Sequence, residues 1–143
     1  MEESIEYLKQ LFDLPRVQPK QYSPLTLAYI GDAVYELVIR TILVSRSNTQ
    51  VNKLHHRASS LVKAQKQSQM IQVLEPHFTP EEEHIYKRGR NAKSYTSAKN
   101  ASITDYRRAT GFEAVIGYLY LKGEFGRMLD LIKLGIDPGE AQE

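Results

Sequence analysis

The sequence predicts a single all-α domain, and three observations lead to this fold class. Apolar residues recur mostly three, four and seven positions apart, as in amphipathic helices, and the alternation of a half-buried strand is scarce. Residues that typically start or end helices bracket the apolar stretches. The length of 143 residues suits one domain with its own hydrophobic core.

The first part of the chain predicts one short and one long helix. Apolar residues at helical spacing between positions 5 and 12 indicate the short helix, which ends before a proline. A polar linker follows over residues 18–22. Ser23 and Pro24 then form a good N-cap and first-turn pair, so we expect a long apolar helix over residues 24–46.

The middle of the chain predicts a second long helix and a shorter one. The long helix covers about residues 50–75 and ends at the next proline. Thr79 and Glu82 have the spacing of a capping box, which starts the shorter helix, and Gly89 is expected to end it. Glycine, asparagine, serine, threonine and lysine are common in residues 89–101, which predicts an exposed loop.

Two further helices complete the predicted domain. They span about residues 103–122 and 124–134, and a glycine ends each of them. The polar tail that follows predicts a frayed terminus. We therefore expect one domain over residues 1–143, with a short N-terminal helix followed by a core over about residues 23–134.

Composition excludes several classes of protein and site. The sequence has no cysteine, which excludes disulfides, thiolate zinc sites and a cysteine nucleophile. Its four histidines lack zinc-ligand spacing, and it has no Gly-rich phosphate loop or serine nucleophile motif. No apolar run approaches the roughly 20 residues that span a bilayer, and the acidic start is unlike a signal peptide. We therefore expect a cytoplasmic protein that does not bind membranes.

Positive charge is concentrated in one segment. The formal net charge is +2, yet residues 87–108 contain seven basic residues and a single acid, Asp105, so the segment carries +6 and the remainder −4. A local field of this kind favours a polyanionic partner such as nucleic acid. The seven basic residues are Lys87, Arg88, Arg90, Lys93, Lys99, Arg107 and Arg108.

Two of the predicted helices carry acids at unusual positions. The first long helix is apolar almost all round but contains Asp32 and Glu36, which are four positions apart and share one face. The helix before the last is similarly apolar and contains Glu113. Each helix also has a glycine near its middle, Gly31 or Gly117, which predicts close approach of another backbone.

Helices that cross at these glycines would bring Asp32 and Glu113 together. Two nearby carboxylates repel each other unless a cation or a proton lies between them, and a buried carboxylate is costly unless it is paired. An all-oxygen site of this kind suits Mg²⁺, which retains several waters. The alternative, which remains equally open, is an ion pair between Asp32 and a buried arginine, such as Arg40, Arg57 or Arg107.

The residues around these acids resemble a known family. Residues 29–38, Tyr-Ile-Gly-Asp-Ala-Val-Tyr-Glu-Leu-Val, resemble the signature helix of the ribonuclease III catalytic domain. Residues 112–119, Phe-Glu-Ala-Val-Ile-Gly-Tyr-Leu, resemble its second acidic motif, and the similarity covers about residues 23–134. The absence of a double-stranded-RNA-binding domain after it, together with the Lys-Arg-Gly-Arg-Asn-Ala-Lys loop at residues 87–93, resembles the mini-ribonuclease III branch.

The resemblance implies a helical homodimer that cleaves double-stranded RNA with Mg²⁺ and leaves 5′-phosphate and 3′-hydroxyl ends. It implies that Asp32 and Glu113 are the catalytic carboxylates and the metal ligands, and that the substrate is the precursor of large-subunit (23S) ribosomal RNA. Two further acids of the family are replaced here by Ala28 and Thr110. Thr110 is a candidate for holding a water through its hydroxyl, and Glu36 is a second candidate supporting residue.

The basic segment is expected to hold the RNA duplex, which proteins read mostly through its shape, phosphates and 2′-hydroxyls. The candidate RNA-binding residues are Lys87, Arg88, Arg90, Lys93, Arg107 and Arg108. Two other classes of function remain open at this point. One is a non-catalytic module that binds RNA or the ribosomal particle, and the other is a helical interaction protein whose basic loop docks on an acidic partner.

Overall fold

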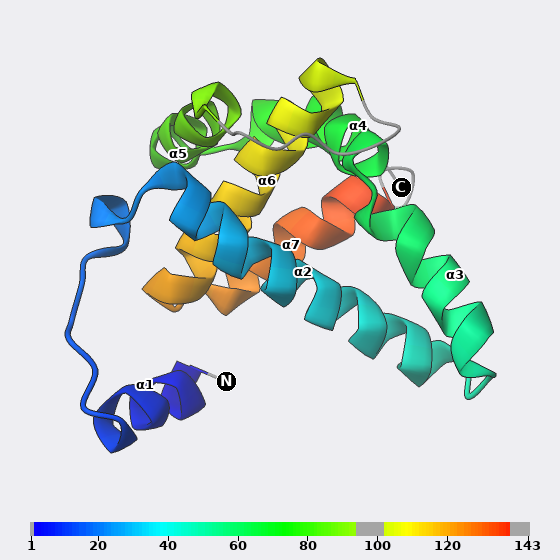
Figure 1. Ribbon diagram of the computed structural model, residues 1–143, viewed down its shortest axis with the longest axis horizontal. Helices are drawn as coiled ribbons and strands as arrows, with labels where there is room; N and C mark the ends of the chain where they lie inside the picture. Colours follow the sequence, from blue (N-terminus) through cyan, green and yellow to red (C-terminus); the bar gives the residue numbers. More distant parts are fainter. Residues whose placement is uncertain (1, 94–101, 138–143) are drawn as a thin grey trace.

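The computed structural model describes residues 2–93 and 102–137, and every regular element in these ranges is helical, which confirms the all-α class (Figure 1). None of these helices is long and apolar enough to cross a membrane. The end of the predicted basic loop and the predicted frayed tail lie outside the described residues. The α-helices are α1 (Glu2–Leu11), α2 (Pro24–Arg46), α3 (Val51–Val62), α4 (Ala64–Leu74), α5 (Pro80–Asn91), α6 (Ile103–Lys122) and α7 (Phe125–Ile136), with 3₁₀ turns η1 (Pro19–Gln21) and η2 (Glu75–His77).

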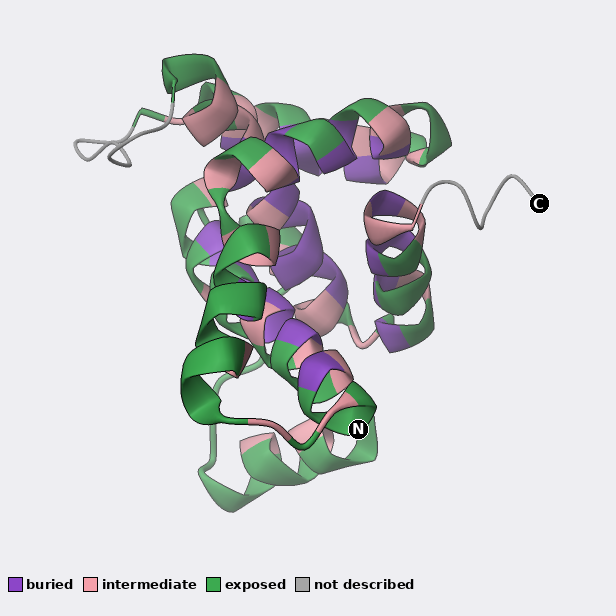
Figure 2. Cartoon of the chain, turned by 90° about the vertical axis from the view of Figure 1, so that its right-hand side faces the viewer, coloured by how far each residue is buried: buried purple, intermediate pink, exposed green. Residues whose placement is uncertain are grey.

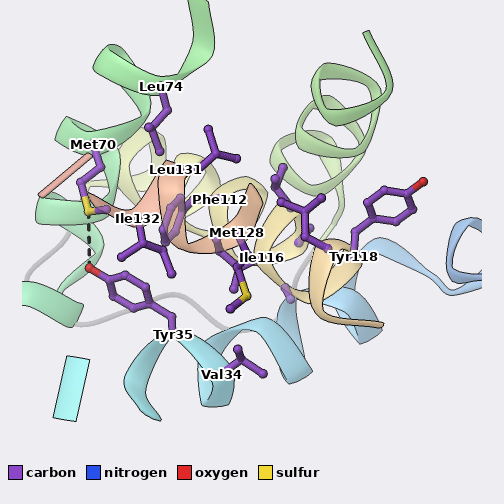
Figure 3. Close-up of a cluster of buried hydrophobic side chains, with 14 of the residues drawn as sticks. Val34, Tyr35, Met70, Leu74, Phe112, Ile116, Tyr118, Met128, Leu131 and Ile132 are labelled. Carbon is purple, nitrogen blue, oxygen red and sulfur yellow. Dashed lines mark hydrogen bonds between the residues drawn. The ribbon is translucent and has the colours of Figure 1, made fainter. Parts of the chain in front are cut away.

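Helix α6 forms the centre of the fold. Half of its twenty residues are buried, and α2, α4 and α5 make the most extensive contacts with it. Burial is concentrated around this helix, whereas α1 has no buried residue and packs against the core through the half-buried Ile5 (Figures 1 and 2). The core includes large buried side chains from α2, α4, α6 and α7, among them Tyr35, Met70, Leu74, Phe112, Leu131 and Ile132 (Figure 3).

Local sequence signals fix several helix ends as predicted. The Thr26 backbone amide donates to the Ser23 hydroxyl oxygen at 3.2 Å, so α2 starts at its predicted cap. Thr79 and Glu82 form the predicted capping box at the start of α5. At the end of α6, Gly123 has a φ of 83°, a left-handed conformation that glycine adopts without steric cost.

The helix predicted over residues 50–75 is wrong, because the chain forms two helices there. Lys63 is extended, with φ −65° and ψ 146°, and separates α3 from α4. Helix α3 packs on α2, whereas α4 packs on α6 and α7. The break thus lets two apolar faces reach different partners, which one straight helix would not achieve.

Two glycines that were predicted to end helices lie inside them instead. Helix α5 continues past Gly89 to Asn91, and α7 includes Gly135. Gly89 allows close packing against the backbone of α6, whereas the atom nearest to a Cβ on Gly135 is the flexible end of the Met70 side chain. A Cβ on Gly89 would lie 2.9 Å from the Gly111 Cα of α6, and one on Gly135 would lie 2.7 Å from the Met70 Cε of α4.

One buried acid ties the start of α5 to α7. Glu82 is only 3% exposed, and Arg127 donates to both of its carboxylate oxygens, at 2.8 and 2.9 Å. Burial alone would raise the pKa of the Glu82 carboxyl, but the hydrogen bonds from Arg127 and the Thr79 backbone outweigh burial and lower it. Glu82 is therefore an ion-paired structural residue.

Candidate functional site

Helices α2 and α6 cross with their backbones in contact, as the two mid-helix glycines predicted. A Cβ on Gly31 would lie 1.8 Å from the Glu113 carbonyl oxygen, and a Cβ on Gly117 would lie 2.0 Å from the Leu27 carbonyl oxygen. Any larger residue at either position would therefore overlap backbone atoms. The crossing brings the α2 turn that carries Asp32 beside the α6 turn that carries Glu113.

The two carboxyl groups meet at this crossing. The pKa of the Glu113 carboxyl is raised to about 9, first by burial and then by a hydrogen bond to the Asp32 carboxyl and by the negative charge of that group. Glu113 is half-buried, but Asp32 is exposed. The expectation that both acids are withdrawn from water is therefore wrong for Asp32, because in the single chain the side of α2 that carries it faces solvent.

The alternative of an arginine partner for Asp32 is not observed. Within residues 2–93 and 102–137, no ion pair involves Asp32. Arg40 instead pairs with Glu36, one turn before it on α2. The spacing of four between these two residues signals such a pair in the sequence, and the sequence analysis missed it. The Glu36 carboxylate faces Arg40 here, and its supporting role at the carboxyl pair stays a prediction.

The donor set at the crossing fits a hard divalent cation. In the described part of the chain, no three His, Asp or Glu side chains form a group that could hold a metal ion, so Asp32 and Glu113 would be the two protein ligands. Mg²⁺ is commonly bound by one or two carboxylates together with waters and substrate phosphates. Burial and the neighbouring Asp32 carboxyl raise the pKa of Glu113, and a bound cation would oppose this shift by favouring the charged carboxylate.

Aromatic side chains of α2 and α6 pack against each other. Tyr35 is fully buried, and its ring meets the Phe112 ring edge-on, with centroids 5.2 Å apart. The Tyr35 hydroxyl donates to the Leu61 carbonyl at 2.9 Å and lies 3.4 Å from the Met70 sulfur, an interaction drawn in Figure 3. These contacts join α2 to α3, α4 and α6, and Tyr35 and Phe112 lie close in sequence to Asp32 and Glu113. Burial, followed by the charge of Glu113, raises the pKa of Tyr35 and keeps it protonated.

The residues that replace the two other family acids lie one turn before each carboxylate. Ala28 precedes Asp32 on α2 and is 8% exposed. Thr110 precedes Glu113 on α6, is 7% exposed, and donates its hydroxyl proton to the Tyr106 carbonyl at 3.0 Å. Since that proton is used within the helix, the Thr110 oxygen is left to act only as an acceptor.

The basic residues at the end of α5 differ in how freely they can meet an anion. Lys87 pairs with Glu83 at 3.5 Å, and Arg88 donates to the Lys20 carbonyl at 3.4 Å. The Arg90 guanidinium lies 5.6 Å from the centre of the Tyr86 ring, and Lys93 is exposed. Lys99 lies outside the described residues.

Two further arginines lie near the start of α6. Arg107 is exposed and Arg108 is half-buried. Neither makes an ion pair with Asp105 or with another acid among the described residues. They precede Glu113 on the same helix by six and five residues.

Comparison with known proteins gives consistent matches. Residues 25–124 match the family model of the ribonuclease III domain. The chain is 56% identical to Mini-ribonuclease 3 of Clostridium tetani over 119 residues, which is 82% of this chain and 79% of that protein. It is 49% identical to Mini-ribonuclease 3 of Enterococcus faecalis, over 87% of this chain and 96% of that protein. A crystal structure of a Fusobacterium nucleatum protein has a TM-score of 0.75 at 28% identity, and the match covers 83% and 95% of the two chains.

Proposed function

We propose that Asp32 and Glu113 form the catalytic centre of this chain, which belongs to the ribonuclease III family, among the mini-ribonuclease 3 proteins. The chain is an endoribonuclease of double-stranded RNA. Support comes from the crossing of α2 and α6, where the two carboxyl groups lie within hydrogen-bonding range of each other. The exposure of Asp32 leaves this site open to a substrate as large as an RNA duplex. The carboxyl pair is the observation that carries the proposal.

The reaction needs no protein nucleophile. A divalent cation, Mg²⁺ in this proposal, would lower the pKa of a bound water and polarise the phosphodiester. Asp32 and Glu113 would hold that cation, and the contact between the Tyr35 and Phe112 rings would help to fix the relative position of α2 and α6. Attack of water on phosphorus breaks the bond to the 3′ oxygen, which takes up a proton, and leaves a 5′-phosphate on the other fragment.

Removal of the metal tests this proposal directly. Incubation with a long RNA duplex and Mg²⁺ is expected to give short fragments with 5′-phosphate ends, and a chelator is expected to stop the reaction. Gel electrophoresis and end labelling measure both effects. Undiminished cleavage in excess chelator would contradict the metal ligand roles, whereas binding without cleavage under every divalent ion would favour the RNA-binding module.

The basic residues of α5 and α6 are proposed to hold the phosphates of the duplex on either side of the cut. Neutralising Lys87, Arg88 and Arg90 together to glutamine is expected to weaken duplex binding and to reduce its salt dependence. If each residue contacts one phosphate, the slope of log affinity against log salt falls by about 2 to 3. Binding titrations at several salt concentrations measure this slope.

The matched control for this variant changes charge elsewhere. Lys9 and Arg16, on α1 and the segment after it, are outside the basic segment, and changing both to glutamine is expected to leave the slope nearly unchanged. If the triple variant kept the wild-type slope, the basic end of α5 would have no part in holding the RNA.

We further propose a homodimer, because a single site cannot cut both strands of a duplex without rebinding. Helix α2 exposes large apolar side chains on the side that carries Asp32, including Tyr29, which is 82% exposed, and Leu37. An apolar groove of about 640 Å³ between α2 and α7 adjoins Leu37. Exposed apolar surface of this kind is typical of an interface between chains. Sedimentation equilibrium measures the oligomeric state, and a monomer at micromolar concentration would refute the dimer.

The finer biological assignment rests on the family resemblance. We propose that the substrate is the precursor of 23S ribosomal RNA, that the ribosomal particle is a partner, and that the protein acts in the cytoplasm. Sequencing the ends of this RNA in cells that lack the protein tests the assignment, because unprocessed ends are expected to accumulate.

A further inference from the structure

Helix α1 lies outside the residues that match the ribonuclease III domain. The match begins at residue 25, after α1 and η1, and α1 contributes no residue to the carboxyl pair. Residues 12–18 form no regular helix and connect α1 to η1 (Figure 1). A stretch of this length spans up to about 25 Å, so α1 can reach beyond its own domain.

Helix α1 leaves most of its apolar side chains in water. Its half-buried positions are Ile5, Glu6 and Lys9, and two of these three are charged. Its large apolar side chains at the remaining positions, together with the one directly after it, are 44–67% exposed. An exposed cluster of this kind marks an interaction site. These exposed side chains are Tyr7, Leu8, Leu11 and Phe12.

The charges of α1 indicate the class of partner. The helix contains three acids and one lysine, which gives a net charge of −2. Glu6 pairs with Arg16, whereas no ion pair among the described residues involves Glu2 or Glu3. RNA and an anionic lipid surface would both repel this helix. A protein groove with apolar walls and a basic end is the surface that complements it.

The groove between α2 and α7 has this chemistry. Apolar side chains dominate its walls, and two of them, Leu37 and Leu129, are 54% and 47% exposed. The last turn of α2 adds Arg46 to the lining, and the last turn of α7 adds Lys133. Among the described residues that line the groove, Asp137 is the one acid. The lining therefore carries a small net positive charge, opposite in sign to that of α1.

The dimensions of the groove also suit α1. Helix α2 lines it from Val34 to Arg46, a stretch of about 18 Å, and the ten residues of α1 extend about 15 Å. Leu8, Leu11 and Phe12 have the i, i+3, i+4 spacing of a helix that docks in a groove. In the single chain no described residue of α1 lines the groove, so the helix that fills it has to come from elsewhere.

We propose that α1 of each protomer docks in the α2–α7 groove of a second copy of the chain, so that the two copies exchange this helix. Leu8 and Phe12 then enter the apolar part of the groove, and Glu2 and Glu3 face Arg46. Exchange of an identical element is a low-cost route to a dimer. The inference rests on the homodimer proposed above and assigns the segment that holds its two chains together.

The absence of cysteine from the sequence allows a direct test by cross-linking. Two full-length chains are co-expressed, a tagged one with Leu8→Cys and an untagged one with Leu129→Cys, and a short bismaleimide is added. Mass spectrometry is expected to find position 8 of one chain joined to position 129 of the other. In the control, Ile103→Cys replaces Leu8→Cys, and no such link is expected, because residue 103 lies at the start of α6.

Sedimentation equilibrium tests the strength of the same contact. Phe12→Ser is expected to raise the dissociation constant of the dimer by about tenfold or more, because burial of a phenylalanine side chain contributes at least that factor. Ile103→Ser is the matched control, since Phe12 and Ile103 are both 67% exposed in the single chain. The control is expected to leave the dissociation constant unchanged.

The outcomes separate this inference from the proposed homodimer. A dimer without a link between positions 8 and 129, or with an equal link from position 103, would overturn the docking of α1 and leave the homodimer in place. An unchanged dissociation constant for the Phe12→Ser protein would do the same. A monomeric unaltered protein would instead contradict the homodimer itself.

Discussion

Replacing Asp32 by asparagine is expected to abolish cleavage of duplex RNA while leaving the fold and RNA binding intact. The side chain is exposed and makes no ion pair among the described residues, so its charge does little for stability. The amide keeps the shape of the carboxylate but removes one of two anionic ligands beside Glu113. A rate loss of at least about 100-fold is expected. Mutating a residue that only hydrogen-bonds to a metal ligand already costs about 10- to 100-fold in metal affinity or activity, and Asp32 is proposed to be a ligand itself.

Single-turnover cleavage with Mg²⁺ measures this loss, and a binding titration with the same duplex shows whether RNA is retained. Asp13→Asn is the matched control, because it makes the same chemical change just after α1. Asp13 has a φ of 50°, a conformation that asparagine adopts readily. Normal turnover by the Asp32→Asn protein would remove Asp32 from the catalytic centre, and unfolding of that protein would show a structural role.

Helix ends could be predicted where the local sequence decides them. Pro24 after Ser23, the capping box at Thr79, and Gly123 all act through neighbouring backbone groups, so their effects can be read from a few residues. The break at Lys63 could not be predicted in this way, because it follows from which helices α3 and α4 pack against. Gly89 was misread for the same reason, since a Cβ there would meet Gly111 and Ala114 of another helix, each at 2.9 Å.

The candidate site was predicted in part. The glycines of the two apolar helices indicated a close crossing, and the structure has that crossing with the acids beside it. The exposure of Asp32 could not be predicted, because an all-apolar helix gives no sign of which side stays uncovered in a single chain.

Replacing Gly31 by alanine, which adds one methyl group to α2, is expected to lower the free energy of unfolding strongly. The new Cβ would lie 1.8 Å from the Glu113 carbonyl oxygen and 2.8 Å from the Gly117 backbone nitrogen. Backbone atoms cannot rotate away as a flexible side chain can, so α2 and α6 must separate. Overpacking in a core costs about 1–3 kcal/mol and sometimes more, and we expect at least 3 kcal/mol here. Chemical denaturation measures the loss as a lower midpoint.

Gly126→Ala in α7 provides the control that isolates the crossing. A Cβ on Gly126 meets nothing within 4 Å, so the alanine is expected to leave the free energy of unfolding unchanged or to raise it by up to about 1 kcal/mol, through helix propensity alone. The two variants make the same chemical change within a helix and differ mainly in what the methyl group meets. Equal stabilities would mean that α2 and α6 do not cross in backbone contact, and the positioning of Asp32 beside Glu113 would lose its physical basis. If the Gly31→Ala protein still folds in the absence of denaturant, it is expected to bind duplex RNA but to cut it slowly. The reason is that separating α2 from α6 moves the two carboxylates apart.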